Sequence, residues 1–388
     1  MRVATSLAIL LLLVAACRRE VKPIDARGRP ILRVGYMPNL THAPALLGVG
    51  GGAFEEFLGR QATIEAKAFN AGPSVIEAVF AGDLDVAYVG PNPAINGFVR
   101  SKGTALRIVA GCTTGGAALV AQEGIGGAAD LVERRVAVPA IANTQDVSLR
   151  IWLRENGRKA RDQGGDVEVL PIAASDILMA FRRGDLAAAW VPEPTVSRLV
   201  VEAGGRLLVD EATLWPTGVY PTTEVIASTA AIRERPDVIR AFVAAHAEAV
   251  RRLQADPAAS RRSVGRFLAE RFHLKLPPPV VASAFDRLAF GVDPMPAELQ
   301  ILAARAVDLG YLPRSPGIEG IVDARFLPAR PPKAGSRPRR GGRLSRGRAR
   351  PGCRPAPGCP RRRRTARSSP PRGASSLGAP GSTASASS

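Results

Sequence analysis

Two similar segments, residues 74–93 and 175–194, constrain the fold of this chain more than any single motif. Each reads as a helix, a Gly-Asp-Leu stop, a buried strand and then Pro-X-Pro, where X is Asn92 in the first segment and Glu193 in the second. The alternative is chance, because Gly-Asp-Leu after a helix is common turn chemistry. We interpret the likeness as two similar α/β units, each presenting a polar residue where open α/β sheets bind ligands.

Strand and helix patterns alternate around these segments. Short apolar runs rich in β-branched residues predict strands, and amphipathic runs that follow turn residues predict helices. The predicted strands are 31–36, 63–69, 85–89 and 135–138, and the predicted helices are 43–49, 73–81, 94–100 and 146–155. Such alternation predicts an α/β fold with mixed, mostly parallel sheets covered by helices.

The positive charge of the chain is confined to its ends. The 388 residues carry a formal net charge of +19, but sixteen of the basic residues fall at or after Arg330, and the last acidic residue is Asp323. Residues 31–329 are therefore close to neutral, which does not support binding of nucleic acid by the folded body. Residues 329–388 cannot bury a core and are predicted to be disordered. One interpretation is that these residues are dispensable and are translated from a shifted reading frame. The other is that they form a basic segment that adheres to anionic lipid or cell-wall polymer.

The N-terminus reads as an export signal. Met1-Arg2 precedes an apolar run at residues 7–16, which ends in Val14-Ala-Ala-Cys17. This end resembles the lipobox of bacterial lipoproteins, in which the cysteine thiol takes a lipid before the cysteine becomes the new N-terminus. We assign residues 1–17 to the lipoprotein signal peptide. Residues 18–30 would then be a tether, and the protein would be anchored by lipid in the periplasm or at the cell surface. The alternative is an ordinary signal peptide with an incidental cysteine.

Several motifs taken together resemble a known family. They are Arg33-Val-Gly-Tyr, Asn39-Leu-Thr-His-Ala-Pro-Ala, Gly82-Asp-Leu-Asp-Val-Ala-Tyr, Gly90-Pro-Asn-Pro-Ala-Ile, Asn143-Thr-Gln-Asp and Ala189-Trp-Val-Pro-Glu-Pro. In order and spacing they resemble the substrate-binding proteins of ABC importers for nitrate, taurine and aliphatic sulfonates. The resemblance implies a two-lobed, periplasmic-binding-protein-like fold with a ligand cleft between lobes that close by a hinge. We place one lobe at 31–118 plus 222–328 and the other at 119–221.

The candidate ligand groups lie at strand-to-helix turns, where unpaired backbone N–H groups and the helix dipole favour an oxyanion. They are Asn39, Thr41, His42, Asn92, Gly115, Gly116, Asn143, Thr144, Gln145, Trp190 and Glu193. Most have a structural alternative: Asn92 can shape a turn, His42 can cap a helix, and Trp190 can be core rather than a surface for an alkyl tail. Asp146 is interpreted as a capping residue of the helix that follows Asn143.

Glu193 distinguishes between cargoes if it faces the cleft. A carboxylate repels a bare oxyanion but pairs with the ammonium group of a zwitterion such as taurine. The alternative is a Glu193 that faces solvent or contacts the permease.

The resemblance therefore implies a binding protein for taurine or an alkanesulfonate, which delivers its cargo to an ABC permease and its ATPase. Nitrate, bicarbonate or a pyrimidine precursor of thiamine are the alternative cargoes, and a ligand sensor or an enzyme of the same fold are the alternative roles. The sequence lacks Gly-X-Ser-X-Gly and His-Glu-X-X-His motifs and holds three histidines, so we expect no catalysis. We also expect no cofactor or metal, and a monomer without disulfides, in which Cys112 is buried core.

Overall fold

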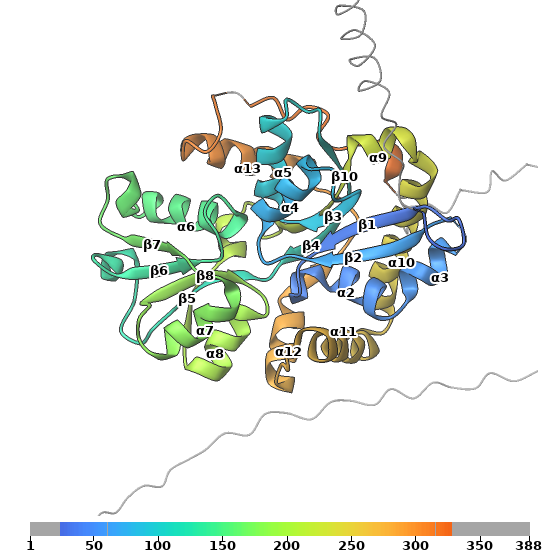
Figure 1. The fold of residues 1–388 in the computed structure, drawn as a ribbon. Coiled ribbons are helices and arrows are strands. Elements are labelled where there is room, and N and C mark those ends of the chain that lie inside the picture. The colour runs from blue at the N-terminus through green and yellow to red at the C-terminus, as the bar shows by residue number, and fades with distance from the viewer. Residues whose placement is uncertain (1–23, 60, 315, 328–388) are drawn as a thin grey trace, which may run out of the picture. The chain divides into compact units, whose positions relative to one another are not determined.

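The computed structural model describes residues 24–59, 61–314 and 316–327, which form two mixed β-sheets flanked by helices (Figure 1). The first sheet has the strand order β11-β4-β10-β3-β1-β2. Its strands are β1 (Ile31–Tyr36), β2 (Thr63–Ala68), β3 (Val86–Val89), β4 (Leu106–Gly115), β10 (Pro221–Ser228) and β11 (Leu288–Phe290). The second sheet has the order β7-β6-β8-β5-β9. Its strands are β5 (Ala117–Ala121), β6 (Arg135–Val138), β7 (Glu168–Pro171), β8 (Ala188–Pro192) and β9 (Arg206–Asp210).

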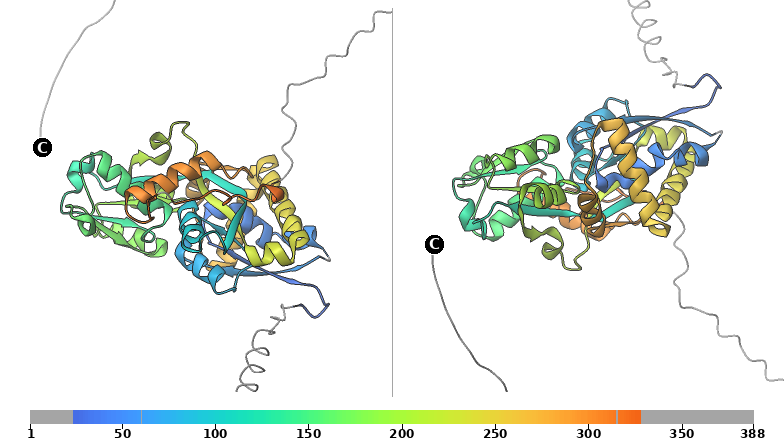
Figure 2. Two further views of the ribbon diagram at one scale, coloured as in Figure 1. Left: turned by 90° about the horizontal axis from the view of Figure 1, so that it is seen from above. Right: turned by 90° about the horizontal axis from the view of Figure 1, so that it is seen from below.

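Helices cover both faces of each sheet, as the two further views in Figure 2 show. One face of the first sheet packs against α2 (Ala43–Gly50), α3 (Ala53–Leu58), α10 (Pro236–Ala255) and α11 (Pro257–Phe272). Its other face packs against α4 (Gly72–Phe80), α5 (Pro91–Arg100) and α13 (Pro296–Asp308). The second sheet lies between α6 (Thr144–Glu155) on one face and α7 (Ala174–Arg182) with α8 (Thr195–Ala203) on the other. The short helices α9 (Thr229–Glu234) and α12 (Pro278–Asp286) complete the α-helices of the described residues.

The two similar sequence segments belong to two structural repeats. The first repeat, β1 to β3, has the parallel order β2-β1-β3, and the second repeat, β6 to β8, has the equivalent parallel order β7-β6-β8. In each repeat a glycine with φ near +76° ends the helix before the third strand, at Gly82 and at Gly184. Both sheets then continue with antiparallel strands, so they are less parallel than the sequence predicted. Four of these antiparallel strands, β4, β5, β9 and β10, carry the chain between the sheets.

The chain passes from the first sheet to the second through Gly115 and Gly116, and it returns between β9 and β10. Both glycines have φ of +75°, a conformation that residues with a side chain rarely adopt. A Cβ on Gly115 would also lie 2.7 Å from the backbone oxygen of Arg287, and one on Gly116 would lie 2.2 Å from Leu288 Cδ2. Glycine is therefore required at this crossing by backbone conformation and by packing.

Most predicted elements are found within a few residues. The main difference is α5, which begins at Pro91 rather than at residue 94. Proline has no N–H to donate and has a helical φ, so Pro91 and Pro93 are tolerated in a first turn, where N–H groups have no intrahelical acceptor. Cys112 is a free, buried core residue, as predicted. Cys17, the signal peptide, residues 18–23 of the tether and the basic tail lie outside the described residues.

Candidate functional site

The described residues enclose a small cavity of about 60 Å³ where the carboxyl ends of parallel strands from both sheets meet. Six predicted site residues line it, namely Asn39, Thr41, His42, Asn143, Thr144 and Gln145. The other lining residues are Met37, Asn70, Ala71, Gly72, Gly90, Pro93, Pro139, Ala174, Pro192 and Thr222. The strand ends of the two repeats thus contribute to one site, in the place that strand-end binding in α/β proteins would suggest.

Helix starts from both repeats open onto this cavity. The first residues or N-caps of α4, α5, α6 and α7 are among its lining, at Gly72, Gly90, Asn143 and Ala174. The first N–H groups of a helix have no acceptor within the helix, and the dipole places partial positive charge there. Four such ends around one cavity favour a bound anion.

No charged side chain is among the described residues that line the cavity. Its donors are neutral hydroxyl, amide and imidazole groups. Thr41 Oγ1 donates to Asn39 Oδ1 at 2.7 Å, and Asn143 Nδ2 donates to Gln145 Oε1 at 3.3 Å. Thr144 Oγ1 is buried and has no hydrogen-bond partner in the protein. This hydroxyl is therefore available to a ligand.

His42 is buried and neutral. Burial lowers the pKa of its imidazole to about 3, because the charged form would lose its hydration. The Met37 backbone N–H donates to His42 Nδ1 at 3.3 Å, so the ring proton resides on Nε2. His42 thus offers one neutral N–H donor at the cavity and does not add a positive charge.

Asn143 caps α6, and Asp146 supports this turn as expected from the sequence. Asn143 Oδ1 accepts from the Asp146 backbone N–H at 2.8 Å, and Asp146 Oδ2 accepts from the Ala142 N–H at 2.8 Å. The Asp146 carboxylate also pairs with Arg150 at 2.7 Å, and both side chains are fully buried. Since the charge of Asp146 is neutralised inside the protein, it does not oppose an anion at the helix start.

Asn92 is not among the residues that line the cavity, although it lies in the first turn of α5 between two that do, Gly90 and Pro93. Its side chain is fully buried, and neither its Oδ1 nor its Nδ2 has a hydrogen-bond partner in the protein. Because a buried polar group without a partner is costly, a ligand or water bound beside it would satisfy these atoms.

Gly115, Gly116 and Trp190 lie away from the cavity. The two glycines form the crossing between the sheets and border a different surface hollow. Trp190 is fully buried between the second sheet and α6, where its Nε1 donates to Glu211 Oε2 at 2.7 Å. Trp190 is therefore a core residue, which was the structural alternative, because other core residues enclose its ring.

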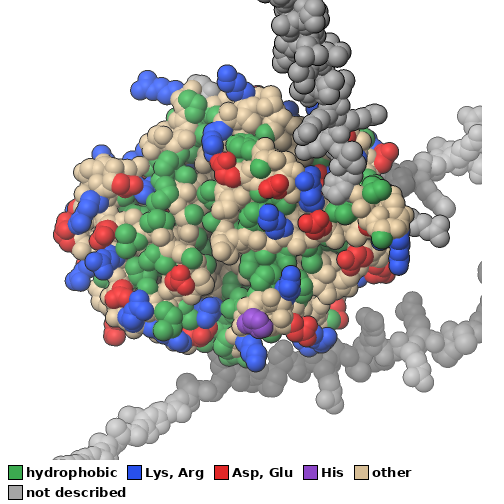
Figure 3. All heavy atoms as spheres, in the orientation of Figure 1, with side chains coloured by type: hydrophobic (Ala, Val, Ile, Leu, Met, Phe, Trp, Pro, Cys, Tyr) green, Lys and Arg blue, Asp and Glu red, His purple; other side chains and the backbone are tan. Residues whose placement is uncertain are grey.

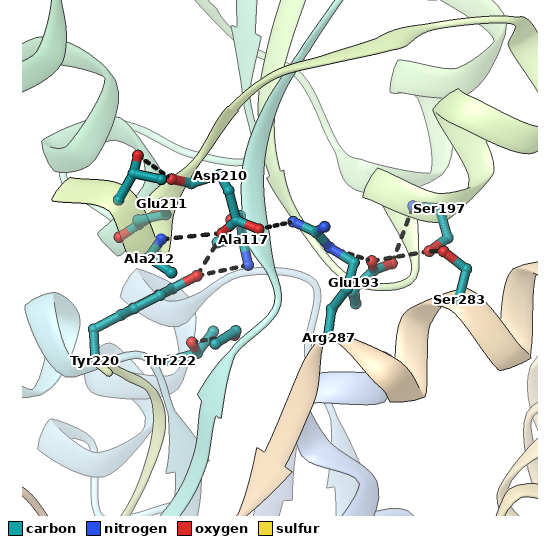
Figure 4. A network of polar contacts seen from close by, with 12 residues as sticks. Ala117, Glu193, Ser197, Asp210, Glu211, Ala212, Tyr220, Thr222, Ser283 and Arg287 are labelled. Carbon is teal, nitrogen blue, oxygen red and sulfur yellow. Dashed lines mark hydrogen bonds and ion pairs between the residues drawn. The ribbon is translucent and has the colours of Figure 1, made fainter. Parts of the chain in front are cut away.

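Glu193 also does not line the cavity, and Figure 4 shows the polar contacts that it makes instead. Its carboxylate is fully buried and accepts from Ser197 N at 3.0 Å and from Ser197 Oγ at 2.9 Å. Arg287 Nε lies 3.3 Å from it and reaches it from the first sheet, while Arg287 Nη2 pairs with Asp210 at 3.0 Å. Burial raises the pKa of Glu193 to about 7, against the opposing effect of these hydrogen bonds and of Arg287. Glu193 therefore joins the two sheets in this structure, and the expected pairing with a ligand ammonium group has no geometric support.

Sequence reasoning missed Asn70, Gly90 and Thr222. Asn70 follows β2 as Asn39 follows β1, so the same argument from strand ends applied to it. Gly90 has a steric role, since a Cβ there would lie 2.8 Å from Thr144 Oγ1. Thr222 comes from the returning strand β10, and no local pattern marks it.

Among the described residues, no group of three His, Cys, Asp or Glu side chains lies close enough to hold a metal ion. No helix of the described part is long and apolar enough to span a bilayer. On the face shown in Figure 3, Lys and Arg side chains are interspersed with Asp and Glu.

The known proteins to which this chain is similar include periplasmic binding proteins. The model of the NMT1-like family matches residues 25–269. The chain is 29% identical over 197 residues to the taurine-binding periplasmic protein of Escherichia coli (strain K12), covering 50% of this chain and 59% of that protein. It is 28% identical over 248 residues to the putative aliphatic sulfonates-binding protein of the same organism, covering 63% and 72%. The matched region spans 59–61% of the first curated relatives.

Solved structures show the same fold. The alkanesulfonate-binding protein of Xanthomonas axonopodis pv. citri bound to MOPS aligns with a TM-score of 0.61 at 23% identity, covering 78% of this chain and 96% of that one. The periplasmic nitrate-binding protein of Synechocystis PCC 6803 aligns with a TM-score of 0.62 at 16% identity, covering 74% and 83%. The predicted periplasmic-binding-protein-like α/β fold is therefore confirmed.

Proposed function

This chain belongs to the NMT1-like family, and we propose that it is the substrate-binding lipoprotein of an ABC importer for a small sulfonate-like oxyanion. The resemblance to nitrate, taurine and sulfonate binding proteins is confirmed by the family match and by the relatives. The importer, the cargo and the lipid anchor are the parts that we propose.

One observation carries the proposal: helix starts from both repeats open onto a single cavity whose described lining is uncharged. An oxyanion fits these donors, because backbone N–H groups and helix dipoles stabilise negative charge. An arginine cluster would hold an anion more tightly and with stronger dependence on salt. Neutral donors suit a carrier that must release its cargo to a permease.

Capture would proceed by movement of one lobe against the other. We propose the lobes at 31–118 plus 222–328 and at 119–221, with a hinge where the chain crosses at Gly115 and Gly116 and returns before β10. Cargo would be held between the strand ends of the two repeats. Cys17 would carry the lipid that keeps the protein at a membrane surface, outside the cytoplasm. The ABC permease and its ATPase would be its partners.

The described lining favours an anion over a zwitterion, because it offers no carboxylate to an ammonium group. Nitrate and bicarbonate satisfy the same donors and remain the alternative cargoes. A pyrimidine precursor of thiamine is the third alternative.

Titration calorimetry with the full-length chain tests the proposal. Methanesulfonate, taurine, nitrate, bicarbonate and an aminopyrimidine are the ligands to titrate. We expect methanesulfonate to bind and Gly90→Ala to weaken that binding at least tenfold, on the order of 1.4 kcal/mol. The reason is that the new methyl group would lie 2.8 Å from Thr144 Oγ1, although the Gly90 backbone, with φ of −62°, accepts alanine.

Gly265→Ala is the matched control, because a Cβ there meets no atom within 4 Å and the residue lies in α11. It should bind methanesulfonate as the unmodified protein does. Binding of the aminopyrimidine alone, or equal binding by both alanine variants, would reject the oxyanion site.

A further inference from the structure

A second hollow adjoins the small cavity. It has a volume of about 310 Å³ and shares Met37, Asn39, Asn70 and Ala174 with the cavity lining. We call it the outer groove and define it by these residues together with Pro38, Phe69, Ala173, Ser175, Pro194, Thr195, Arg198, Phe272 and Leu274. Because the two hollows share lining residues, a ligand with one end bound in the cavity would extend into the outer groove.

The groove differs from the cavity in chemistry. Phe69, Phe272, Leu274 and Met37 give it apolar walls, and two of these are aromatic. Phe272 is held in place by Tyr36 and Phe267, with ring centroids 6.3 and 5.9 Å away. A wall that is already ordered loses little side-chain entropy when a ligand binds.

Charge in the groove is already paired. Arg198 is the one charged residue of its lining among those described, and its Nε donates to Glu202 at 2.9 Å. No Asp or Glu is among the described residues that line either hollow. An amine at the far end of a ligand would therefore find no carboxylate here.

Size separates the two compartments. A cavity of about 60 Å³ has room for the oxygens of an anionic group, since one water needs roughly 10–15 Å³ measured in this way. The larger groove has room for the rest of a ligand that contains a ring. Aromatic walls and Met37 favour a ring through edge, face and sulfur contacts.

We propose that the cargo is an oxyanion carrying an aromatic ring, with its anionic group in the cavity and its ring in the outer groove against Phe69 and Phe272. This inference rests on the proposed function and names the class of substrate. It separates the protein from a carrier of taurine, because the groove presents apolar surface where taurine has an ammonium group.

Calorimetry on the full-length chain with methanesulfonate, ethanesulfonate, taurine and benzenesulfonate tests it. Burial of the ring should make benzenesulfonate bind at least about tenfold more tightly than methanesulfonate. Taurine should bind no more tightly than ethanesulfonate, which has the same two-carbon chain but no amine. Equal affinity for methanesulfonate and benzenesulfonate would overturn the inference and leave the proposed function intact. If none of the sulfonates and no nitrate bound, both would be overturned.

A pair of phenylalanine variants locates the ring. Phe69→Ala should lower the affinity for benzenesulfonate about tenfold and leave methanesulfonate unchanged. Phe57→Ala is the control, because Phe57 is exposed on α3 and lines neither hollow. Leu274→Ser gives a second test of the same wall, so that misfolding of one variant does not decide the outcome. If Phe69→Ala and Leu274→Ser both bind benzenesulfonate as the unmodified protein does, the ring does not lie in the outer groove.

Discussion

The two repeats share a topology but use their Pro-X-Pro residue differently. In the first repeat Asn92 is buried at the start of α5 with both polar side-chain atoms unpartnered. In the second repeat Glu193 is equally buried, but Ser197 and Arg287 occupy its carboxylate oxygens. The repeated pattern thus determines where each residue lies, and the surrounding elements determine what it does.

Glu193 and Asn92 differ because other elements bring partners to Glu193 and none to Asn92 among the described residues. Arg287 follows α12 and extends to Glu193 from the first sheet, and Ser283 Oγ of α12 lies 3.0 Å from Ser197 Oγ (Figure 4). No such partner is found for Asn92 among the described residues. One repeat therefore leaves the side chain of Asn92 without a partner in the protein, while the other uses Glu193 to join the sheets.

Leucine at each of the two positions should give opposite results. Glu193→Leu should lower the free energy of unfolding by about 3 kcal/mol, because it leaves the buried Ser197 N–H without its acceptor and removes the ion pair between Glu193 and Arg287, which then keeps only Asp210. Asn92→Leu should leave the free energy of unfolding unchanged or raise it by about 1 kcal/mol, since it removes unpartnered buried polar atoms. Denaturant unfolding without ligand measures both.

Asn92→Leu should also lower the affinity for methanesulfonate at least tenfold, because the buried amide that it removes has no partner in the protein and is left for a ligand. The melting temperature of this variant should not fall. A strong loss of stability in Asn92→Leu would mean that Asn92 shapes the turn, and the contrast between the repeats would be lost.

The pH dependence of stability gives a second, smaller contrast. The Glu193 carboxyl titrates near 4.5 in the unfolded chain, and burial raises its pKa to about 7 in the folded protein. Between these pH values the folded protein holds a proton that the unfolded chain has released. The free energy of unfolding therefore falls as pH rises from about 5 to 7 and levels off above that, by on the order of 2–3 kcal/mol from this group.

Glu193→Gln should remove this contribution. Between pH 5 and 8, the free energy of unfolding of the variant should therefore fall less than that of the unmodified protein. Comparing variants matters because Glu211 and Glu224 have pKa values raised by burial, while burial lowers those of His42 and His246. Glu77→Gln on the exposed surface of α4 is the control. Parallel pH profiles for Glu193→Gln and the unmodified protein would show that Glu193 is not held in this environment.

Much of the fold could be read from local patterns. Apolar runs, glycine stops and the repeated Gly-Asp-Leu gave the elements of both repeats, because burial and turn conformation act on neighbouring residues. The antiparallel strands β4, β5 and β10 were harder to predict, since their pairing depends on residues distant in sequence. The early start of α5 was hidden by prolines that usually signal the end of a helix.

The site was predictable where it follows from strand ends. Asn39, Thr41, His42 and the Asn143-Thr-Gln turn come together for this reason. Trp190 and Glu193 also lie at a strand end, in β8 and directly after it. Tertiary contacts nevertheless bring Glu211 to Trp190 and Arg287 to Glu193, and no local sequence pattern indicates these partners. The sequence could therefore indicate where a polar residue lies but not which residue it contacts in the folded protein.

The smallest predicted effect tests the likeness of the repeats directly. Gly82 and Gly184 both have φ of +76°, and a Cβ at either would meet no atom within 4 Å. Alanine at either position should then lower the free energy of unfolding by about 1 kcal/mol through backbone strain alone. The two losses, measured by denaturant unfolding, should agree within about 0.5 kcal/mol, because both glycines have the same φ and open space around the added Cβ. A loss at one glycine and none at the other would mean that the two turns are not equivalent, and the common architecture inferred from Gly-Asp-Leu would then rest on strand order alone.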